Sequence, residues 1–383
     1  MIRKIITVTL FLTLLFTFQR ASAQENSFSL KPSGRILMDA GLFSSKNKDF
    51  ANGAAIPDVR IGLKASYGTY KAKIDMGFGY GKLSLKDVFI EKQFGASSLL
   101  RLGYFVHQFG LQSSTSSSMK VTMEEPISNA ALFNSRLLGA MYVFSKDQFF
   151  ATASIHVENE AIKKATNETG DQGYGAMSRL VYRPFKNDGK IFHVGISGAI
   201  ETPRYSTDPD QNHSSFVLSA NYPSRIAKVK ALEANITDAK RLFKFTPELL
   251  FACHRIGLET QYYYMNVARK DGFKNYKATG AYALVRGLIL GGSYKYSDSD
   301  SGLSTPAPGS LECVLGYNYT DMSDREAGIL GGRLNDASVT FNYYINKYMI
   351  WRFRYSYTHV SNSVLNADNQ SVNAFQTRLQ ILF

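Results

Sequence analysis

Apolar and polar residues alternate along most of the chain after residue 23, and this period of two predicts amphipathic β-strands. The clearest block runs from Ala337 to Val360, with a break at Asn346-Lys347. One face of its two halves carries Val339, Phe341, Tyr343 and Ile345, then Met349, Trp351, Phe353, Tyr355 and Tyr357. Two alternating segments around a two-residue break are typical of a β-hairpin.

The same alternation gives about 18 candidate strands, most of them close to the roughly 9 to 11 residues that a tilted membrane-spanning strand needs. They lie near residues 34–43, 59–67, 71–80, 85–94, 98–108, 136–144, 148–158, 173–184, 190–201, 214–222, 243–252, 255–267, 274–284, 287–297, 310–320, 339–345, 349–357 and 372–383.

Short turns alternate with long polar connections along this series. The turns include Gly68-Thr69 and Lys186-Asn187-Asp188-Gly189, and the long connections are 44–56, 159–172, 202–213, 298–309 and 361–371. This order predicts a barrel with short turns at one rim and the long loops at the other. A soluble sandwich or propeller is the alternative, but neither explains an apolar face on nearly every strand. We therefore predict an all-β fold, a transmembrane antiparallel β-barrel forming a single domain over residues 24–383.

Both ends of the chain support this prediction. Arg3 and Lys4 precede an apolar run that ends at Ala21-Ser22-Ala23, which is typical of a signal peptide over residues 1–23. The run is too short for a membrane anchor. The last strand alternates up to the terminal Phe383, which resembles the signal read by the barrel-assembly machinery of bacterial outer membranes. We expect the mature protein in the outer membrane of a Gram-negative bacterium, in contact with its lipid.

Composition and charge then narrow the range of possible functions. The 383 residues carry a net charge of +13, and 23 Tyr, 26 Phe and 30 Gly favour β-structure. Loss of residues 1–23 removes Arg3, Lys4 and Arg20, which leaves +10. An exported chain does not meet nucleic acid, so we expect no nucleic-acid partner. The charge instead suits a path for small anions.

The sequence gives little support for an enzyme, a metal site or a cofactor. Cys253 and Cys313 lie in separate strand-like segments, where a disulfide or two free thiols are both compatible with export. The six histidines show no ligand spacing, so we predict no metal and no cofactor. His359, Ser361 and Asn362 would be the candidates for an outer-membrane hydrolase, but three polar residues at a strand end are commonplace. We expect no enzymatic activity.

Several segments resemble the phosphate-selective porins of the O and P type. Val59 to Tyr67 followed by Tyr70 to Asp75 resembles an early strand pair of that family, and Leu85-Lys-Asp-Val-Phe-Ile-Glu91 resembles its LKDAYIEY motif. Further similar stretches are Leu102 to Ser118, Met123-Glu124, Ser135 to Gly139, Ile236 to Ala239, Leu249 to Tyr262 and Val339 to His359. Pro57-Asp58 departs from the family, which has two arginines there, so a broader range of anionic solutes is equally compatible.

The resemblance implies a homotrimer of 16-stranded barrels, so 16 strands are preferred to the 18 counted. It also implies a loop folded into the lumen and a ladder of cations. The residues that the resemblance assigns to the constriction are Ser113, Ser117, Ser118, Lys120, Arg136 and Asp87. The cations on the polar phase of the strands, which form the predicted lumen ladder, are Arg60, Lys64, Lys71, Lys73, Arg101, Arg179, Arg352, Arg354 and Arg378.

Charged side chains in a barrel of this size are tolerated on the lumen face and costly on the lipid face. Cations that line a lumen concentrate anions and replace part of their hydration. The sequence therefore predicts an outer-membrane porin for passive diffusion of small anionic solutes, phosphate or polyphosphate included. A structural or adhesive barrel with a plugged lumen is the alternative.

Cleavage of the leader gives a direct test. N-terminal sequencing of protein extracted from outer membranes should begin at Gln24, because the small residues Ala21 and Ala23 define the cleavage site. Protein that begins at Met1 would contradict the assignment of residues 1–23.

Overall fold

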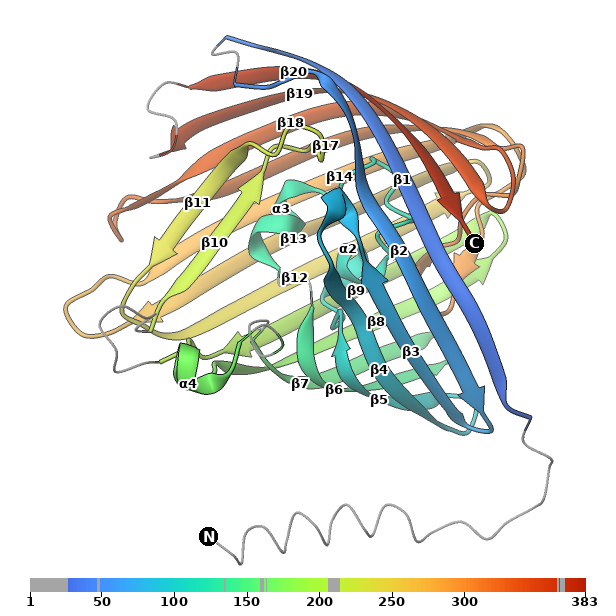
Figure 1. Cartoon of the computed structure of the whole chain (residues 1–383), viewed down its shortest axis with the longest axis horizontal. Coiled ribbons are helices and arrows are strands. Elements are labelled where there is room, and N and C mark those ends of the chain that lie inside the picture. Colours follow the sequence, from blue (N-terminus) through green and yellow to red (C-terminus); the bar gives the residue numbers. More distant parts are fainter. Residues whose placement is uncertain are drawn as a thin grey trace, which may run out of the picture.

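The computed structural model describes residues 27–46, 49–133, 136–158, 162, 164–205, 214–299, 301–363, 365 and 369–383; the predicted signal peptide lies outside them. Sixteen antiparallel strands form a closed barrel (Figure 1). They are β1 (Ser29–Ser45), β2 (Gly53–Tyr67), β3 (Tyr70–Gly77), β4 (Ser84–Phe94), β5 (Ser98–Phe105), β6 (Leu137–Lys146), β7 (Phe149–Val157), β8 (Tyr174–Asn187), β9 (Lys190–Glu201), β12 (Ala239–Cys253), β13 (Ile256–Arg269), β14 (Tyr276–Leu290), β17 (Leu311–Asp324), β18 (Ile329–Tyr344), β19 (Met349–Ser363) and β20 (Gln370–Leu382). The barrel closes where β20 pairs with β1, from Arg35 opposite Leu382 to Ser45 opposite Val372.

The two phases of each strand face different surroundings. Large apolar side chains on the outer phase stay exposed, as Phe341 (41%) and Phe353 (46%) do, whereas Thr340 and Asn342 on the inner phase are fully buried. An apolar outer surface and a polar interior are what a barrel in a lipid bilayer requires. The alternation in the sequence is thus confirmed as the inside-outside pattern of a membrane barrel.

Two of the 18 candidate strands are not separate barrel strands. Residues 214–222 contain β10 (Phe216–Asn221), which pairs with β11 (Lys230–Ile236) in a hairpin inside the barrel ring. The apolar side of this hairpin packs in one cluster with lumen-facing residues such as Leu334 and Val360. Its alternation therefore reflects a buried face rather than a lipid face.

Residues 287–297 were also predicted as a strand of their own, and this is wrong. Their first part ends β14 at Leu290, the chain breaks at Gly291-Gly292, and β15 (Tyr296–Ser297) and β16 (Gly302–Leu303) form a small hairpin. The connection 291–310 follows the twelfth barrel strand, and an even number of strands returns the chain to the rim of short turns such as Gly68-Thr69, which follows the second. The prediction that 298–309 lies at the long-loop rim is therefore wrong as well.

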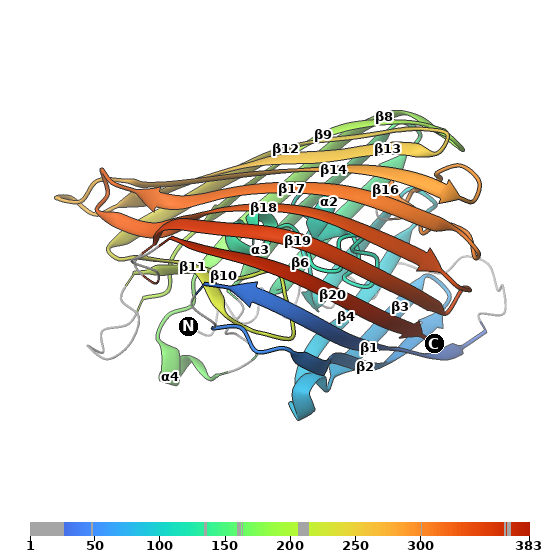
Figure 2. The same ribbon diagram turned by 90° about the horizontal axis from the view of Figure 1, so that it is seen from above.

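Hydrogen bonds place the connection 291–310 at the rim of short turns. Gly189 N donates to Tyr294 O (2.9 Å), Tyr294 N donates to His254 O (2.9 Å), and Lys295 pairs with Asp188 (2.8 Å). Figure 2 shows β16 at the same end of the barrel as the C-terminus. The short-turn rim thus carries a long connection of its own.

Helices are few and short. α2 (Gly110–Ser114) and α3 (Ile127–Leu132) belong to the connection between β5 and β6, and both views show them surrounded by strands (Figures 1 and 2). The rest are η1 (Gly79–Gly81) and α4 (Thr166–Thr169). In the described part of the chain no helix is long and apolar enough to cross a membrane. The inward position of the β5–β6 connection agrees with the predicted lumen loop.

Candidate functional site

The segment 106–133, which follows β5, is fixed inside the barrel by hydrogen bonds to distant strands. These bonds run from Gln112 N to Gln261 Oε1 (2.9 Å), from Ser128 N to Asn318 Oδ1 (3.0 Å), from Asn342 Nδ2 to Val121 O (3.0 Å) and from Gln380 Nε2 to Ser118 O (3.0 Å). The partners lie on β13, β17, β18 and β20. The segment is therefore held against one side of the barrel.

A glycine permits the first of these contacts. Gly110 begins α2 with φ of 83°, a left-handed conformation that glycine adopts without strain. A Cβ atom at this position would lie 1.9 Å from Nε2 of Gln261. The backbone of Gly110 can approach β13 because it carries no side chain.

The packing divides the lumen into a filled side and an open side. Inner side chains of the filled side, on β8, β12 to β14 and β17 to β20, are almost fully buried; examples are Glu248, Gln261 and Gln380. On the open side, β2 to β5, Lys64 and Lys71 are exposed and the side chains of Lys73 and Arg101 are 22% and 26% exposed. Solvent in the lumen therefore meets mainly β2 to β5.

Cations predominate on this open side. We define the basic wall as seven inward cations of β1 to β4 and the start of β6: Arg35, Arg60, Lys64, Lys71, Lys73, Lys86 and Arg136. The carboxylates interspersed with them are Asp58, Asp75, Asp87 and Glu91, and Glu91 is paired with Arg101. Lys64, Lys71 and Lys86 form no ion pair with any described residue. The wall therefore keeps an excess of positive charge.

Strand register arranges the basic wall in rungs along the barrel. Lys71 lies opposite Ser66 next to the short-turn rim, Lys73 lies opposite Lys64 two residues further along β3, and Arg60 lies opposite Arg35 on the next strand pair. Inward residues two apart on a strand are roughly 7 Å apart. An anion on this wall thus has another cation within a short step.

Aspartates fix the arginines of the wall. Asp58 accepts hydrogen bonds from Arg35 and from Nε (3.0 Å) and NH2 (3.1 Å) of Arg60. Asp87 accepts from Arg136 Nε (2.7 Å) and Lys73 Nζ (2.8 Å). The aspartates thereby orient the arginine side chains and occupy part of their hydrogen-bonding capacity, whereas Lys64 and Lys71 are exposed to solvent.

Glu124 connects the inward segment to Arg225, which also pairs with Asp58 of the basic wall (3.6 Å). It accepts from Arg225 Nε (2.8 Å) and from Arg378, which also pairs with Asp39 (2.6 Å). Burial alone would raise the pKa of Glu124, but Arg225 and Arg378 outweigh burial and lower the pKa below its ordinary value. Glu124 is therefore a neutralised anchor and adds no free negative charge to the path.

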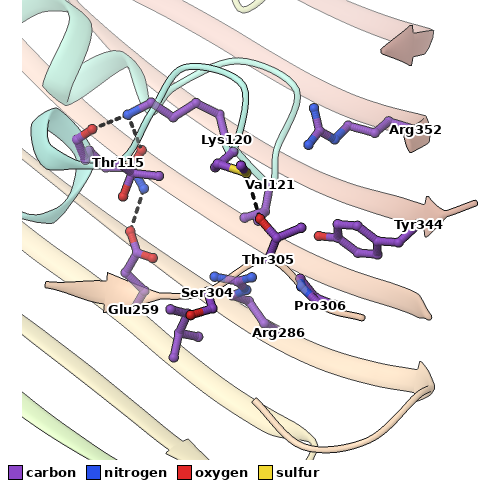
Figure 3. A pocket seen from close by; sticks show the side chains of 13 residues that line it. Thr115, Lys120, Val121, Glu259, Arg286, Ser304, Thr305, Pro306, Tyr344 and Arg352 are labelled. Atoms are coloured by element: carbon purple, nitrogen blue, oxygen red, sulfur yellow. Dashed lines mark hydrogen bonds between the residues drawn. The ribbon is translucent and has the colours of Figure 1, made fainter. Parts of the chain in front are cut away.

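Lys120 lies elsewhere, in a recess on the filled side (Figure 3). The recess has a volume of about 20 Å³ and is also lined by Arg286, Arg352 and Thr305. Nζ of Lys120 donates to the carbonyl and to Oε1 of Gln112, and burial lowers the pKa of Lys120. About one water-sized species fits in this volume. The recess can hold a water molecule or a small ion, but it is not a passage.

The structure thus separates the residues predicted for the constriction. Asp87 and Arg136 meet on the basic wall, as described. Ser113 bonds within its own turn, accepting from Phe109 N (2.6 Å), and the Ser118 carbonyl accepts from Arg352 and Gln380. Ser117 is half-buried in the same segment. Ser113, Ser118 and Lys120 therefore serve to hold the segment in place.

The predicted lumen ladder divides in the same way. Arg60, Lys64, Lys71 and Lys73 belong to the basic wall, and Arg101 pairs with Glu91 on the open side. The remaining members are buried, each with its own polar partners: Arg179 with Glu248 (2.6 Å), Arg354 with Asp336 (2.8 Å), Arg378 with Asp39 (2.6 Å), and Arg352 with Gln380 (2.9 Å). All nine face the lumen, but four of them do not meet its open side.

Sequence reasoning missed Arg35, Lys86 and Arg225. The polar phase of the first strand could have identified Arg35. Lys86 sits next to Asp87, and a register shift between Ile74 and Met76 of β3 marks a bulge that lets both β4 residues face inward. Arg225 lies between β10 and β11, and nothing in the local sequence indicates that it reaches Glu124.

Other site types find no support in the described part of the chain. There, no group of three or more His, Cys, Asp or Glu side chains is placed to hold a metal ion. Cys253 and Cys313 are free thiols. The candidate site is therefore the lumen wall.

The family can now be stated. Residues 31–383 match the model of the family described as phosphate-selective porin O and P. The chain belongs to this family. No curated protein matches the chain in sequence. The family and the barrel identify an outer-membrane channel.

Solved structures share the fold at low identity. OmpT of Vibrio cholerae has a TM-score of 0.62 at 10% identity, covering 95% of this chain and all of that one. The outer membrane channel DcaP of Acinetobacter baumannii has a TM-score of 0.57 at 12% identity, covering 96% of this chain and all of that one. OmpF of Salmonella typhi, solved in complex with daunomycin, has a TM-score of 0.52 at 12% identity, covering 94% and 100%. The likeness extends over the whole barrel.

The filled side gives a stability prediction. Glu312 is fully buried and accepts from Arg286 (2.8 Å), Tyr294 (2.7 Å) and Tyr344 (2.7 Å). Glu312→Ala leaves a buried arginine unpaired and should cost about 3 to 5 kcal/mol of unfolding free energy, measured by urea titration in lipid vesicles.

Glu233→Ala is the matched control, because it breaks a more exposed pair with Lys230. That change should cost no more than about 1 kcal/mol. Equal losses in the two variants would contradict the burial of Glu312 in a part of the lumen that excludes water.

Proposed function

We propose that the protein conducts small anions through the outer membrane, along the basic wall. The observation that carries this proposal is the excess of cations on the solvent-exposed side of the lumen, where Lys64, Lys71 and Lys86 form no ion pair with the residues that the structure describes. Cations on a channel wall raise the local concentration of anions and compensate for lost hydration. Several weak sites in series also let each anion leave again.

The chemistry of the wall favours a general anion path over a phosphate-specific one. Selective phosphate binding uses arginine forks that donate two parallel hydrogen bonds. Nε and NH2 of Arg60 already donate to Asp58, and Nε of Arg136 donates to Asp87. The free lysines act as point charges, which attract chloride, carboxylates and phosphate alike. We infer a broad selectivity for small anions.

The filled side of the lumen favours a second candidate, a non-conducting structural barrel. The segment 106–133 and the β10–β11 hairpin occupy the interior. At the short-turn rim, Gly302 lies next to Leu111 and Thr115 of the inward segment. If the barrel does not conduct, the basic wall would only face water in a closed pocket. Absence of any single-channel current from reconstituted protein would favour it.

We also propose a homotrimer. The support comes from a related fold, since OmpT of Vibrio cholerae, at 10% identity and a TM-score of 0.58, has been solved in a trimer form. Chemical crosslinking of the protein in native membranes should give a ladder that ends at three copies. A ladder that ends at one copy would exclude the trimer.

Charge reversal on the wall tests the proposed path. The double variant Lys64→Glu, Lys86→Glu should lower the chloride-over-potassium permeability ratio several-fold, because it removes two unpaired cations and adds two anions next to the solvent. The measurement is the reversal potential under a KCl gradient in planar bilayers.

Lys274→Glu, in the exposed turn between β13 and β14, is the control and should leave the ratio unchanged. Lys120→Gln should also leave it unchanged, since Lys120 lies on the filled side. An unchanged ratio in the double variant would refute the path, even if the protein conducts.

A further inference from the structure

The outer surface of the barrel has a trough that the channel function does not use. Two adjoining hollows, of about 740 and 620 Å³, lie on the outer surface of β5 to β9 and the start of β12. They share Ala140, Ile155, Ala176 and Ile200 among their lining residues, so they form one continuous trough. Elsewhere the outer phase carries mostly large side chains.

Small outward residues on neighbouring strands make the floor of the trough. Ala153 of β7 lies opposite Ser178 of β8, which lies opposite Gly198 of β9. A Cβ atom added to Gly198 would meet no other atom within 4 Å. Tyr142 and Phe243, both more than 40% exposed, stand on either side. The floor is recessed because three adjacent strands lack bulk in one row.

A cation lies at one end of the trough. Arg241 lines the larger of the two hollows and is exposed. It lies two residues after the start of β12, at the long-loop rim. Its side chain makes no ion pair or hydrogen bond with any residue that the structure describes. Tyr174, 66% exposed at the start of β8, lines the same end. Exposed arginine and tyrosine at this level are suited to the lipid head-group region.

We propose that the trough binds an anionic membrane lipid, with an acyl chain along the row of Ala153, Ser178 and Gly198 and the head-group phosphate on Arg241. Charge complementarity decides the occupant. The exposed cation Arg241 at the end of an apolar trough is complementary to a lipid phosphate above an acyl chain. The inference rests on the membrane barrel and is independent of the solute that the lumen conducts.

Fluorescence quenching by brominated lipid tests the proposal on the whole protein in vesicles. Phe243→Trp in a Trp351→Phe background places one reporter in the trough. The native Trp351, 45% exposed on the outer face of β19, is the reporter outside it. Dibrominated phosphatidylglycerol should quench the trough reporter with roughly fivefold higher relative affinity than dibrominated phosphatidylcholine, as expected for one cation near an anionic head group. Trp351 should show no such preference.

Two pairs of variants separate the head group from the acyl chain. Arg241→Ala should abolish the preference, and Lys277→Ala, on the outer face of β14, should keep it. Gly198→Phe should reduce quenching by both lipids, and Gly287→Phe, another glycine with open space around its Cβ position, should not. Equal preferences at the two reporters would overturn the proposal. So would a trough reporter that neither lipid quenches, which would show that a second copy covers it.

Discussion

The need to pair every backbone polar group away from water determines this structure. A bilayer offers no hydrogen-bond partners, so strands can cross it only as a closed sheet. Closure through β20 and β1 completes the ring, and the period of two then assigns each side chain to lipid or lumen. A chain with mean hydropathy of −0.17 can therefore span a membrane, because its polar side chains face the enclosed lumen.

The enclosed interior contains paired charges on its filled side and unpaired charges on its open side. Where inward segments exclude water, nearly every buried cation meets a carboxylate, as Arg286 meets Glu312 and Arg179 meets Glu248. An unpaired charge there would be costly. On β2 to β4 water remains, so Lys64 and Lys71 need no partner. The excess positive charge of the lumen is confined to the side where a solute can reach it, and this separation is the basis of the proposed anion path.

Alternation in the sequence predicted the barrel and the inward phase of Arg60, Lys64 and Lys73, and the family resemblance predicted the inward loop between β5 and β6. It could not predict which inward residues are buried. That depends on contacts between distant residues, such as Ser128 with Asn318, 190 residues apart. For this reason Lys120 was expected at the open constriction and lies in a closed recess. Local pattern also could not distinguish a lipid face from the buried face of β10, and so gave too many strands.

The sign of the reversal potential of the unmodified protein tests this account most directly. Single channels in a planar bilayer between unequal KCl solutions should show a potential shifted toward the chloride equilibrium value, because the lumen wall that meets water in the described part of the chain is basic. A shift toward the potassium equilibrium value, or channels that never conduct, would contradict the claim that the open side of the lumen is an anion path.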